Sequence, residues 1–223
     1  MYSFAQRPDT TVVDEPLYAH YLRVSGADHP GRDQVLASQD TDGGNVMARL
    51  LESSWSTPLV FHKQMAHHLV DLDLGFLDDM DHVFLIRPPR EMLPSLARVL
   101  GNVNLRDTGL PAQLDLLEAL EQRGREPVCL DGSALRRAPG PVLKSLCDRL
   151  GIGYVAAMLR WPAGPRPEDG VWARWWYASV HESTGFRPGA AAPADLPEAV
   201  AHLLDPCLAI YGKLSTYAVS HED

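Results

Sequence analysis

The amino-acid sequence predicts an α/β fold, a doubly wound parallel sheet flanked by helices, in one domain over residues 1–223. Four short apolar runs are β-branched or aromatic and do not alternate with polar residues, which is typical of parallel strands covered on both faces. Helical patterns lie between these runs, and such alternation is typical of a doubly wound sheet. A chain of 223 residues builds one such core and is too short for two comfortable domains.

The expected strands cover Thr10–Asp14, Pro58–His62, His82–Arg87 and Pro127–Asp131. The helical patterns between them cover Asn45–Leu51, Glu91–Leu100, Pro111–Arg123 and Val142–Leu150. Gly151 is suited to stop the last of these helices. A connection rich in Ala and Pro, residues 187–194, then leads to a final helix from Pro197 towards Tyr217, in which Pro206 predicts a kink.

Charge and cysteine content exclude several classes of protein. Lys and Arg number 20 against 29 Asp and Glu, and this net charge of −9 disfavours nucleic acid, although a local basic cluster can still bind a small anion. Cys129, Cys147 and Cys207 form neither a disulfide framework nor a metal-binding pair, which fits a reducing cytoplasm. No apolar run reaches ~18 residues and the N-terminus lacks a signal-peptide pattern, so we expect a cytoplasmic protein without a membrane partner.

Polar side chains stand at the end of every expected strand. In chain order they are Asp14 with Glu15, His62 with Lys63, Arg87, and Asp131. Because ligands bind at the carboxyl ends of strands in open parallel sheets, we expect two acids, a lysine and an arginine to converge on one crevice. The alternative is that these residues are ordinary polar groups where strands give way to loops.

The strongest local signal is the segment Phe84-Leu-Ile-Arg-Pro-Pro-Arg-Glu-Met-Leu-Pro-Ser95. Arg87 ends a strand, and Ser95 lies eight residues further on in the following helix. Such a pair can grip one phosphate, the arginine through a forked, charge-assisted contact. The alternative is that Arg87 pairs with Asp14 or Glu15 and that Ser95 is a small packing residue.

This segment resembles the phosphate-binding strand–helix motif of sulfotransferases, which have a P-loop-NTPase-like fold. The segments Val12–Tyr18, Phe61–His68 and Trp161–Trp172 look like bacterial members of the family, so the resemblance covers nearly the whole chain. It implies transfer of a sulfuryl group from the co-substrate 3′-phosphoadenosine 5′-phosphosulfate (PAPS) to a hydroxyl or amine of a small-molecule acceptor. The scheme requires no metal.

The resemblance also implies roles for individual residues. Lys63 is placed like the lysine that steadies the transferring group, and Arg87 and Ser95 like the grip on the nucleotide phosphate. The segment from Gly164 resembles a late loop over the nucleotide, which makes Arg166 and Trp172 candidates for nucleotide binding.

Two residues compete as the base that takes the acceptor's proton. Glu15 is placed like the acidic base of some carbohydrate sulfotransferases, whereas many members use a histidine soon after the lysine, here His67. A metal site at His62, His67 and His68 is not expected, because their spacing places no pair on one helical face. We expect the aromatic residues from Trp172 to Tyr177 mainly to pack in the core.

The family begins with a strand and a glycine-containing loop whose N–H groups cradle the phosphosulfate. Met1-Tyr-Ser-Phe resembles the middle of the helix that follows, so we expect the first strand and loop to be missing. Either the start codon was assigned too late or the chain is a degenerate member. The second case gives an alternative function, a catalytically inactive nucleotide-binding or interaction module of the same fold. Coding sequence upstream of Met1 discriminates between them.

Overall fold

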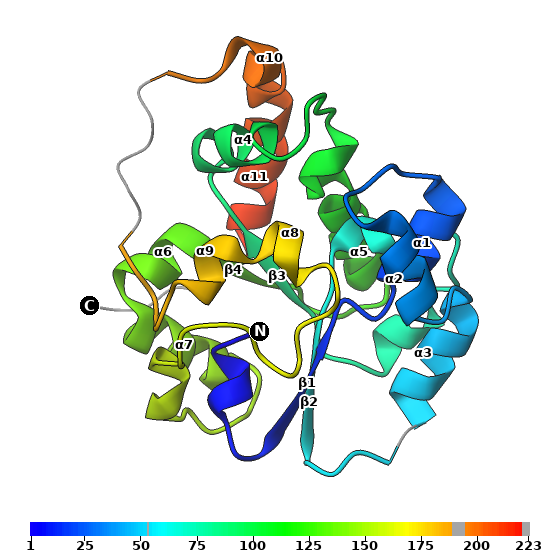
Figure 1. The fold of residues 1–223 in the computed structure, drawn as a ribbon. Helices are drawn as coiled ribbons and strands as arrows, with labels where there is room; N and C mark the ends of the chain where they lie inside the picture. Colours follow the sequence, from blue (N-terminus) through cyan, green and yellow to red (C-terminus); the bar gives the residue numbers. More distant parts are fainter. Residues whose placement is uncertain (53, 189–194, 220–223) are drawn as a thin grey trace. The chain divides into compact units, whose positions relative to one another are not determined.

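The computed structural model describes residues 1–52, 54–188 and 195–219 (Figure 1). These residues divide into two compact units, which are described separately. The first unit comprises Met1–Asp79 and Val155–Phe186, and the second comprises the described residues of Met80–Tyr154 and Arg187–Asp223. That residues 1–223 form one domain stays a prediction.

The first unit contains two of the four predicted strands. Strand β1 (Thr10–Asp14) pairs in parallel with β2 (Leu59–Lys63), so that Thr10 lies opposite Leu59 and Asp14 lies opposite Lys63. β1 has the predicted bounds, and β2 is shifted by one residue. This register brings an acid and a lysine together at the carboxyl ends of both strands.

Short helices complete the first unit (Figure 1). They are η1 (Phe4–Gln6), α1 (Tyr18–Ser25), α2 (Arg32–Ser38), α3 (Gly43–Glu52), η2 (Ala66–His68), η3 (Gly75–Asp78), η5 (Ala156–Leu159), α8 (Ala173–Trp176) and α9 (Ala178–His181). α3 contains the predicted segment 45–51. α1 and α2 were not predicted; they pack through Tyr18, Leu22 and Val35 into a core that also holds Trp172 and Tyr177.

The second unit contains the other two predicted strands. β3 (Val83–Ile86) and β4 (Val128–Asp131) are parallel and in register from Val83 opposite Val128. Helices surround them: α4 (Pro89–Ala97), η4 (Arg106–Thr108), α5 (Leu110–Gln122), α6 (Gly132–Arg137), α7 (Pro139–Arg149), α10 (Glu198–Ala201) and α11 (Leu204–Ser215). The fold is therefore α/β, and its parallel strands form two small two-stranded sheets flanked by helices.

Three details depart from the sequence-based expectation. The strands are not covered on both faces throughout, since Leu85 in β3 is 54% exposed. The last helix is two helices, α10 and α11, and Pro206 lies in the first turn of α11. A proline is tolerated there because its missing N–H has no partner within the helix, so it produces no kink. Most of the expected connection 187–194 lies outside the described residues.

The predicted end of α7 at Gly151 is confirmed. Gly151 ends α7 in the left-handed region at φ 66°. The N–H of Ile152 donates to the carbonyl of Cys147 at 2.9 Å, and that of Gly151 donates to Asp148 at 3.2 Å, which together cap the helix. All three cysteines are buried and free. Within the described ranges, no helix is long and apolar enough to cross a bilayer.

Candidate active site

Two carboxylates and one lysine meet at the ends of β1 and β2. Lys63 forms an ion pair with the Oε1 of Glu15, and its Nζ lies 3.7 Å from Oδ1 of Asp14. Both acids are buried, with Asp14 7% and Glu15 6% exposed. Burial raises the pKa of Glu15, although the positive charge of Lys63 opposes the shift. The first unit thus holds the acid and lysine that the sequence predicted as catalytic.

The backbone holds Glu15 in an unusual conformation. Its φ of 39° lies in the left-handed region, which costs a residue other than glycine about 1–3 kcal/mol. Its N–H donates to the carbonyl of Lys63 at 2.7 Å, and its own carbonyl accepts from the N–H of Tyr18 at 3.1 Å and from Nε2 of Gln39 at 3.0 Å. These bonds fix the carboxylate beside Lys63.

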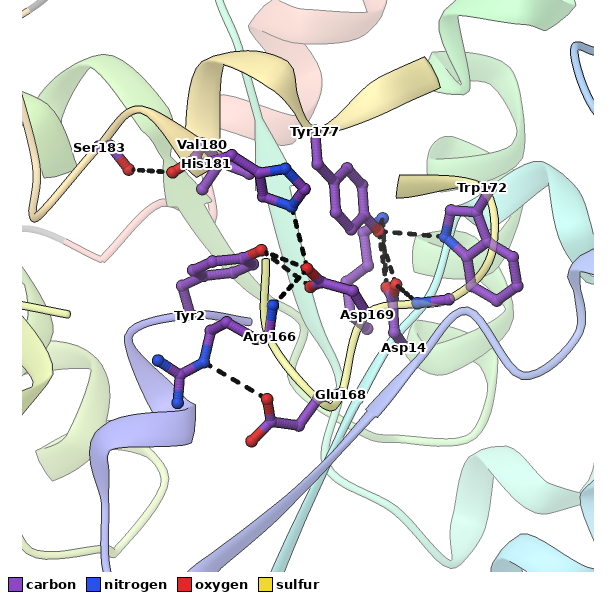
Figure 2. A network of polar contacts seen from close by, with 12 residues as sticks. Tyr2, Asp14, Arg166, Glu168, Asp169, Trp172, Tyr177, Val180, His181 and Ser183 are labelled. Carbon is purple, nitrogen blue, oxygen red and sulfur yellow. Dashed lines mark hydrogen bonds and ion pairs between the residues drawn. The ribbon is translucent and has the colours of Figure 1, made fainter. Parts of the chain in front are cut away.

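Tyr177 joins the two acids and the lysine, a role that the sequence did not indicate. Its hydroxyl accepts from Nζ of Lys63 at 2.7 Å and lies 2.7 Å from Oδ1 of Asp14, to which it donates. Nε1 of Trp172 also donates to this hydroxyl, at 3.3 Å (Figure 2). Burial, reinforced by the charges of Glu15 and Asp14, raises the pKa of Tyr177, so this phenol remains neutral.

His68 faces the Glu15 carboxylate. Nδ1 of His68 lies 3.8 Å from Oε2 of Glu15, and the imidazole stacks on the rings of Tyr18 and Tyr21 with centroids 4.7 and 4.8 Å apart. Burial, together with the positive charges of His67 and Lys63, lowers the pKa of His68 well below its usual value. His67 makes an edge contact with Tyr21, at 5.0 Å between centroids.

The predicted nucleotide loop also lies in the first unit. Arg166 pairs with Glu168, with Nε 3.4 Å from Oε2, and its backbone N–H donates to Asp169 (Figure 2). The N–H of Gly170 donates to Oδ2 of Asp14 at 3.1 Å, which ties the loop to the end of β1. A Cβ at Gly170 would lie 2.1 Å from the Trp172 ring, so only glycine permits this packing. Trp172 itself is 2% exposed and belongs to the core.

Asp169 anchors this loop through three further partners. Its carboxylate lies 2.8 Å from the hydroxyl of Tyr2 and 3.0 Å from Nε2 of His181, and it accepts from the N–H of Arg166 at 2.8 Å (Figure 2). The segment that carries Arg166 is therefore built into the unit. Asp169 was not predicted as part of a site, and its partner Tyr2 lies 167 residues away along the chain.

The predicted phosphate grip lies in the second unit. Arg87 directly follows β3, and its Nη2 donates to the backbone carbonyl of Glu91 at 3.4 Å. Ser95 lies on α4, one helical turn beyond Glu91 and on the same face. Lys63 pairs with Glu15 within the first unit, and the alternative pairing of Arg87 with Asp14 or Glu15 joins residues of different units and stays a prediction. Whether Arg87 and Lys63 share one crevice stays a prediction.

Asp131, the acid predicted at the end of the fourth strand, serves as a helix cap. Its Oδ1 accepts from the N–H groups of Ser133 and Ala134 at 2.8 and 2.7 Å, and its Oδ2 accepts from the hydroxyl of Tyr211 at 2.5 Å. These bonds start α6. In the part of the chain that the structure describes, no cluster of three or more His, Cys, Asp or Glu residues is arranged to hold a metal ion.

Comparison with known proteins defines the family. The sulfotransferase domain family matches residues 1–218. The chain is 41% identical over 218 residues to branched-chain-amino-acid aminotransferase-like protein 1 of Arabidopsis thaliana. It is 38% identical over 215 residues to branched-chain-amino-acid aminotransferase-like protein 2 of the same plant. These matches cover 97% and 96% of this chain but only 39% and 38% of the plant proteins. The chain thus spans about two fifths of the length of these curated relatives.

Two solved structures are also similar. The sulfotransferase domain from the curacin biosynthetic pathway matches with a TM-score of 0.44 and 16% identity, over 90% of this chain and 77% of that domain. The sulfotransferase domain from the Synechococcus PCC 7002 olefin synthase matches with a TM-score of 0.41 and 17% identity, over 90% and 94%. From the match over residues 1–218, the chain belongs to the sulfotransferase domain family.

Proposed function

We propose that this chain transfers a sulfuryl group from PAPS to a hydroxyl or amine of a small-molecule acceptor. The observation that carries the proposal is the buried Glu15 carboxylate held against Lys63 at the carboxyl ends of two parallel strands. A proton acceptor beside a fixed cation is what transfer of a charged group to a hydroxyl requires.

Glu15 is the residue that removes the acceptor's proton. Its raised pKa makes it a better proton acceptor than an exposed glutamate, while the positive charge of Lys63 favours its ionised form. His68 cannot replace it readily, because the imidazole is 1% exposed and its pKa is lowered. His67 remains the competing base.

Lys63 supplies positive charge where the transferred group would carry negative charge. Its side chain is 26% exposed, so the ammonium is accessible although Tyr177 and Glu15 orient it. Tyr177 satisfies Asp14 at the same time, which leaves Lys63 less engaged by that acid. PAPS, when bound, supplies the activated sulfuryl group; the residues of this chain orient it and accept the proton.

The residues around Arg87 suit the nucleotide phosphate. Arg87 and Arg136 both pass Gly132, and burial, followed by the positive charges of Arg136 and Arg98, lowers the pKa of Arg87. A phosphate dianion is the kind of ligand that such a cluster favours. Arg166 is a second candidate for the nucleotide, and its pairing with Glu168 has to open for direct contact.

The experiment is a transfer assay on the gene product that contains residues 1–223. Release of adenosine 3′,5′-bisphosphate from PAPS should depend on an added acceptor from a panel of phenols, alcohols and amines. A catalytically inactive module would bind adenosine 3′,5′-bisphosphate in calorimetry and release none from PAPS with any acceptor. Absence of both binding and release would overturn the proposal and the alternative together.

A further inference from the structure

Two arginines of the second unit contact one glutamate, and a third lies on the same helix. Arg136, on α6, forms an ion pair with the Oε2 of Glu91, and Arg87 donates to the Glu91 backbone carbonyl at 3.4 Å. Arg98 ends α4 on the face that also carries Glu91 and Ser95, at helical spacings of seven and three residues. The charge of Arg98 acts on Arg87 in the same direction as that of Arg136. Arg87 therefore lies near two further positive charges and a single carboxylate.

Local geometry directs Arg87 and Arg136 to the same place. A Cβ on Gly132 would lie only 3.3 Å from Cγ of Arg87, so this glycine leaves room for the arginine side chain to pass. Nε of Arg136 donates to the carbonyl of the same Gly132 at 3.3 Å. Because both arginines run past one residue at the start of α6, their guanidinium groups reach Glu91 from a fixed frame.

Glu91 occupies these groups without neutralising them. Its Oε1 accepts from the Ser133 hydroxyl at 2.7 Å while its Oε2 binds Arg136. The side chains of Glu91 and Arg136 are 20% and 30% exposed, so solvent and small ions reach the pair. A single carboxylate leaves two of the three positive charges uncompensated, which favours a ligand with two negative charges.

We propose that Arg136 is a further ligand of the phosphate bound by Arg87 and Ser95, and that the Glu91 carboxylate holds Arg136 until the phosphate displaces it. The proposal rests on the proposed function in one respect, that this phosphate is the 3′-phosphate of PAPS. Glu91 then acts as an internal competitor: it lowers nucleotide affinity and so assists release of the product nucleotide. A dianionic phosphate displaces the carboxylate more readily than a monoanion does, because it offers more charge and more acceptor oxygens.

Calorimetry with adenosine 3′,5′-bisphosphate tests this exchange, in which the phosphate replaces the Glu91 carboxylate on Arg136. Glu91→Gln should bind about fivefold to tenfold more tightly than the wild type, because the competitor loses its charge. Arg136→Ala should bind about tenfold more weakly, and the double variant should show no gain over Arg136→Ala. The matched control is Glu118→Gln, which removes a carboxylate from an exposed pair with Lys213 in the same unit and should leave affinity unchanged. Adenosine 5′-monophosphate, without the 3′-phosphate, should not respond to these changes.

Each outcome decides the inference. One outcome is that the wild type binds the bisphosphate through Arg87 and that three variants, Glu91→Gln, Arg136→Ala and Arg136→Lys, bind it with the wild-type affinity. The proposed exchange is then wrong, and the proposed function stands. If Arg136→Ala does not fold, Glu91→Gln and Arg136→Lys decide alone, and unchanged affinity in both overturns the exchange. If the wild type does not bind the nucleotide, the proposed function fails and inorganic phosphate becomes the probe. A rise in melting temperature that Arg136→Lys loses then supports the exchange, and an equal rise or none overturns it.

Discussion

At the ends of β1 and β2 two carboxylates share one lysine, whereas in the second unit the Glu91 carboxylate pairs with Arg136, and the charges of Arg136 and Arg98 act on the neighbouring Arg87. The first cluster is buried, and this burial raises the pKa of Glu15, although the positive charge of Lys63 opposes the shift. The second is partly exposed, and its excess positive charge attracts an anion. The two clusters therefore suit different tasks, proton transfer in the first and anion binding in the second.

The two clusters also differ in the charge of the residue that orients the others. In the first cluster Tyr177 is neutral and lies between Lys63 and Asp14, so it orients the charges without adding one. In the second, Glu91 carries a charge of its own and must give way to a ligand. A neutral hydroxyl such as that of Tyr177 suits a site whose charges must stay fixed during the reaction. A charged carboxylate such as that of Glu91 suits a site where one anion replaces another.

The largest expected effect is the loss of turnover when a substitution disrupts the first cluster alone. Glu15→Gln should lower turnover about 100-fold or more because the proton acceptor is lost, while affinity for adenosine 3′,5′-bisphosphate stays nearly intact. Lys63 retains Asp14 at 3.7 Å, so the change does not leave its charge without a counter-ion. Steady-state kinetics measure the loss, with Glu52→Gln, an exposed acid of the same unit, as control. If His67→Ala abolishes turnover and Glu15→Gln does not, the roles of the two residues are reversed.

The second prediction breaks the other cluster. Arg87→Ala should weaken binding of adenosine 3′,5′-bisphosphate by ~1.5–3 kcal/mol, the scale of a charged hydrogen bond. The matched control is Arg90→Ala, an exposed arginine three residues further on in α4. Calorimetry that gives the wild-type affinity for Arg87→Ala would remove Arg87 from the binding site. Turnover at saturating nucleotide should change less than affinity, in contrast to Glu15→Gln.

The strands and their polar ends could be predicted because the relevant information is local. Each apolar run of β-branched or aromatic residues stops at a polar or charged one, and this pattern placed Glu15, Lys63 and Arg87 at strand ends. Helix α1 was missed because its buried face includes Tyr18 and His20, polar side chains that mask the apolar spacing.

The partners of these residues could not be predicted, since they come from distant segments. Tyr177 reaches Asp14 across 163 residues of chain, and Arg136 reaches Glu91 across 45. The choice between His67 and His68 as the neighbour of Glu15 depended on the direction of one short turn, η2, which spacing alone does not fix. The structural role of Asp131 as a helix cap was likewise hidden, because a cap and a catalytic acid look the same at a strand end.

A smaller effect is expected on the free energy of unfolding when one tyrosine hydroxyl is removed from each unit. Tyr177→Phe removes a buried hydroxyl and leaves Lys63, Asp14 and Trp172 each with one bond fewer. We expect a loss of about 1–3 kcal/mol in the free energy of unfolding, together with reduced turnover. Tyr211→Phe removes only the bond to Asp131 from a part-buried hydroxyl, and should cost less. Denaturant titration of both variants measures the difference. Equal losses would show that Tyr177 does not organise the charges of its cluster.

The smallest effect is a change in the pH dependence of stability. Burial lowers the pKa of His68 in the folded protein well below 6.5, while the unfolded chain titrates near that value. Below pH 6.5 the unfolded state therefore binds more protons at His68, and stability is lost as the pH falls towards the lower folded pKa. The slope from one such group is at most about 1.4 kcal/mol per pH unit.

His68→Phe retains the ring that stacks on Tyr18 and Tyr21 and removes this titration. Melting temperatures between pH 7 and pH 5 should therefore fall less steeply in the variant than in the wild type. His62, whose pKa burial also lowers, contributes in the same direction in both proteins, so the difference between them reports His68.

Glu15 acts in the opposite sense, because its raised pKa gives stability that is lost as the pH rises above 4.5. The double variant with Glu15→Gln separates the two: a slope that His68→Phe changes equally with and without Glu15 belongs to the histidine alone. An unchanged slope in both backgrounds would mean that the pKa of His68 is the same in the folded and the unfolded chain, so that burial does not lower it.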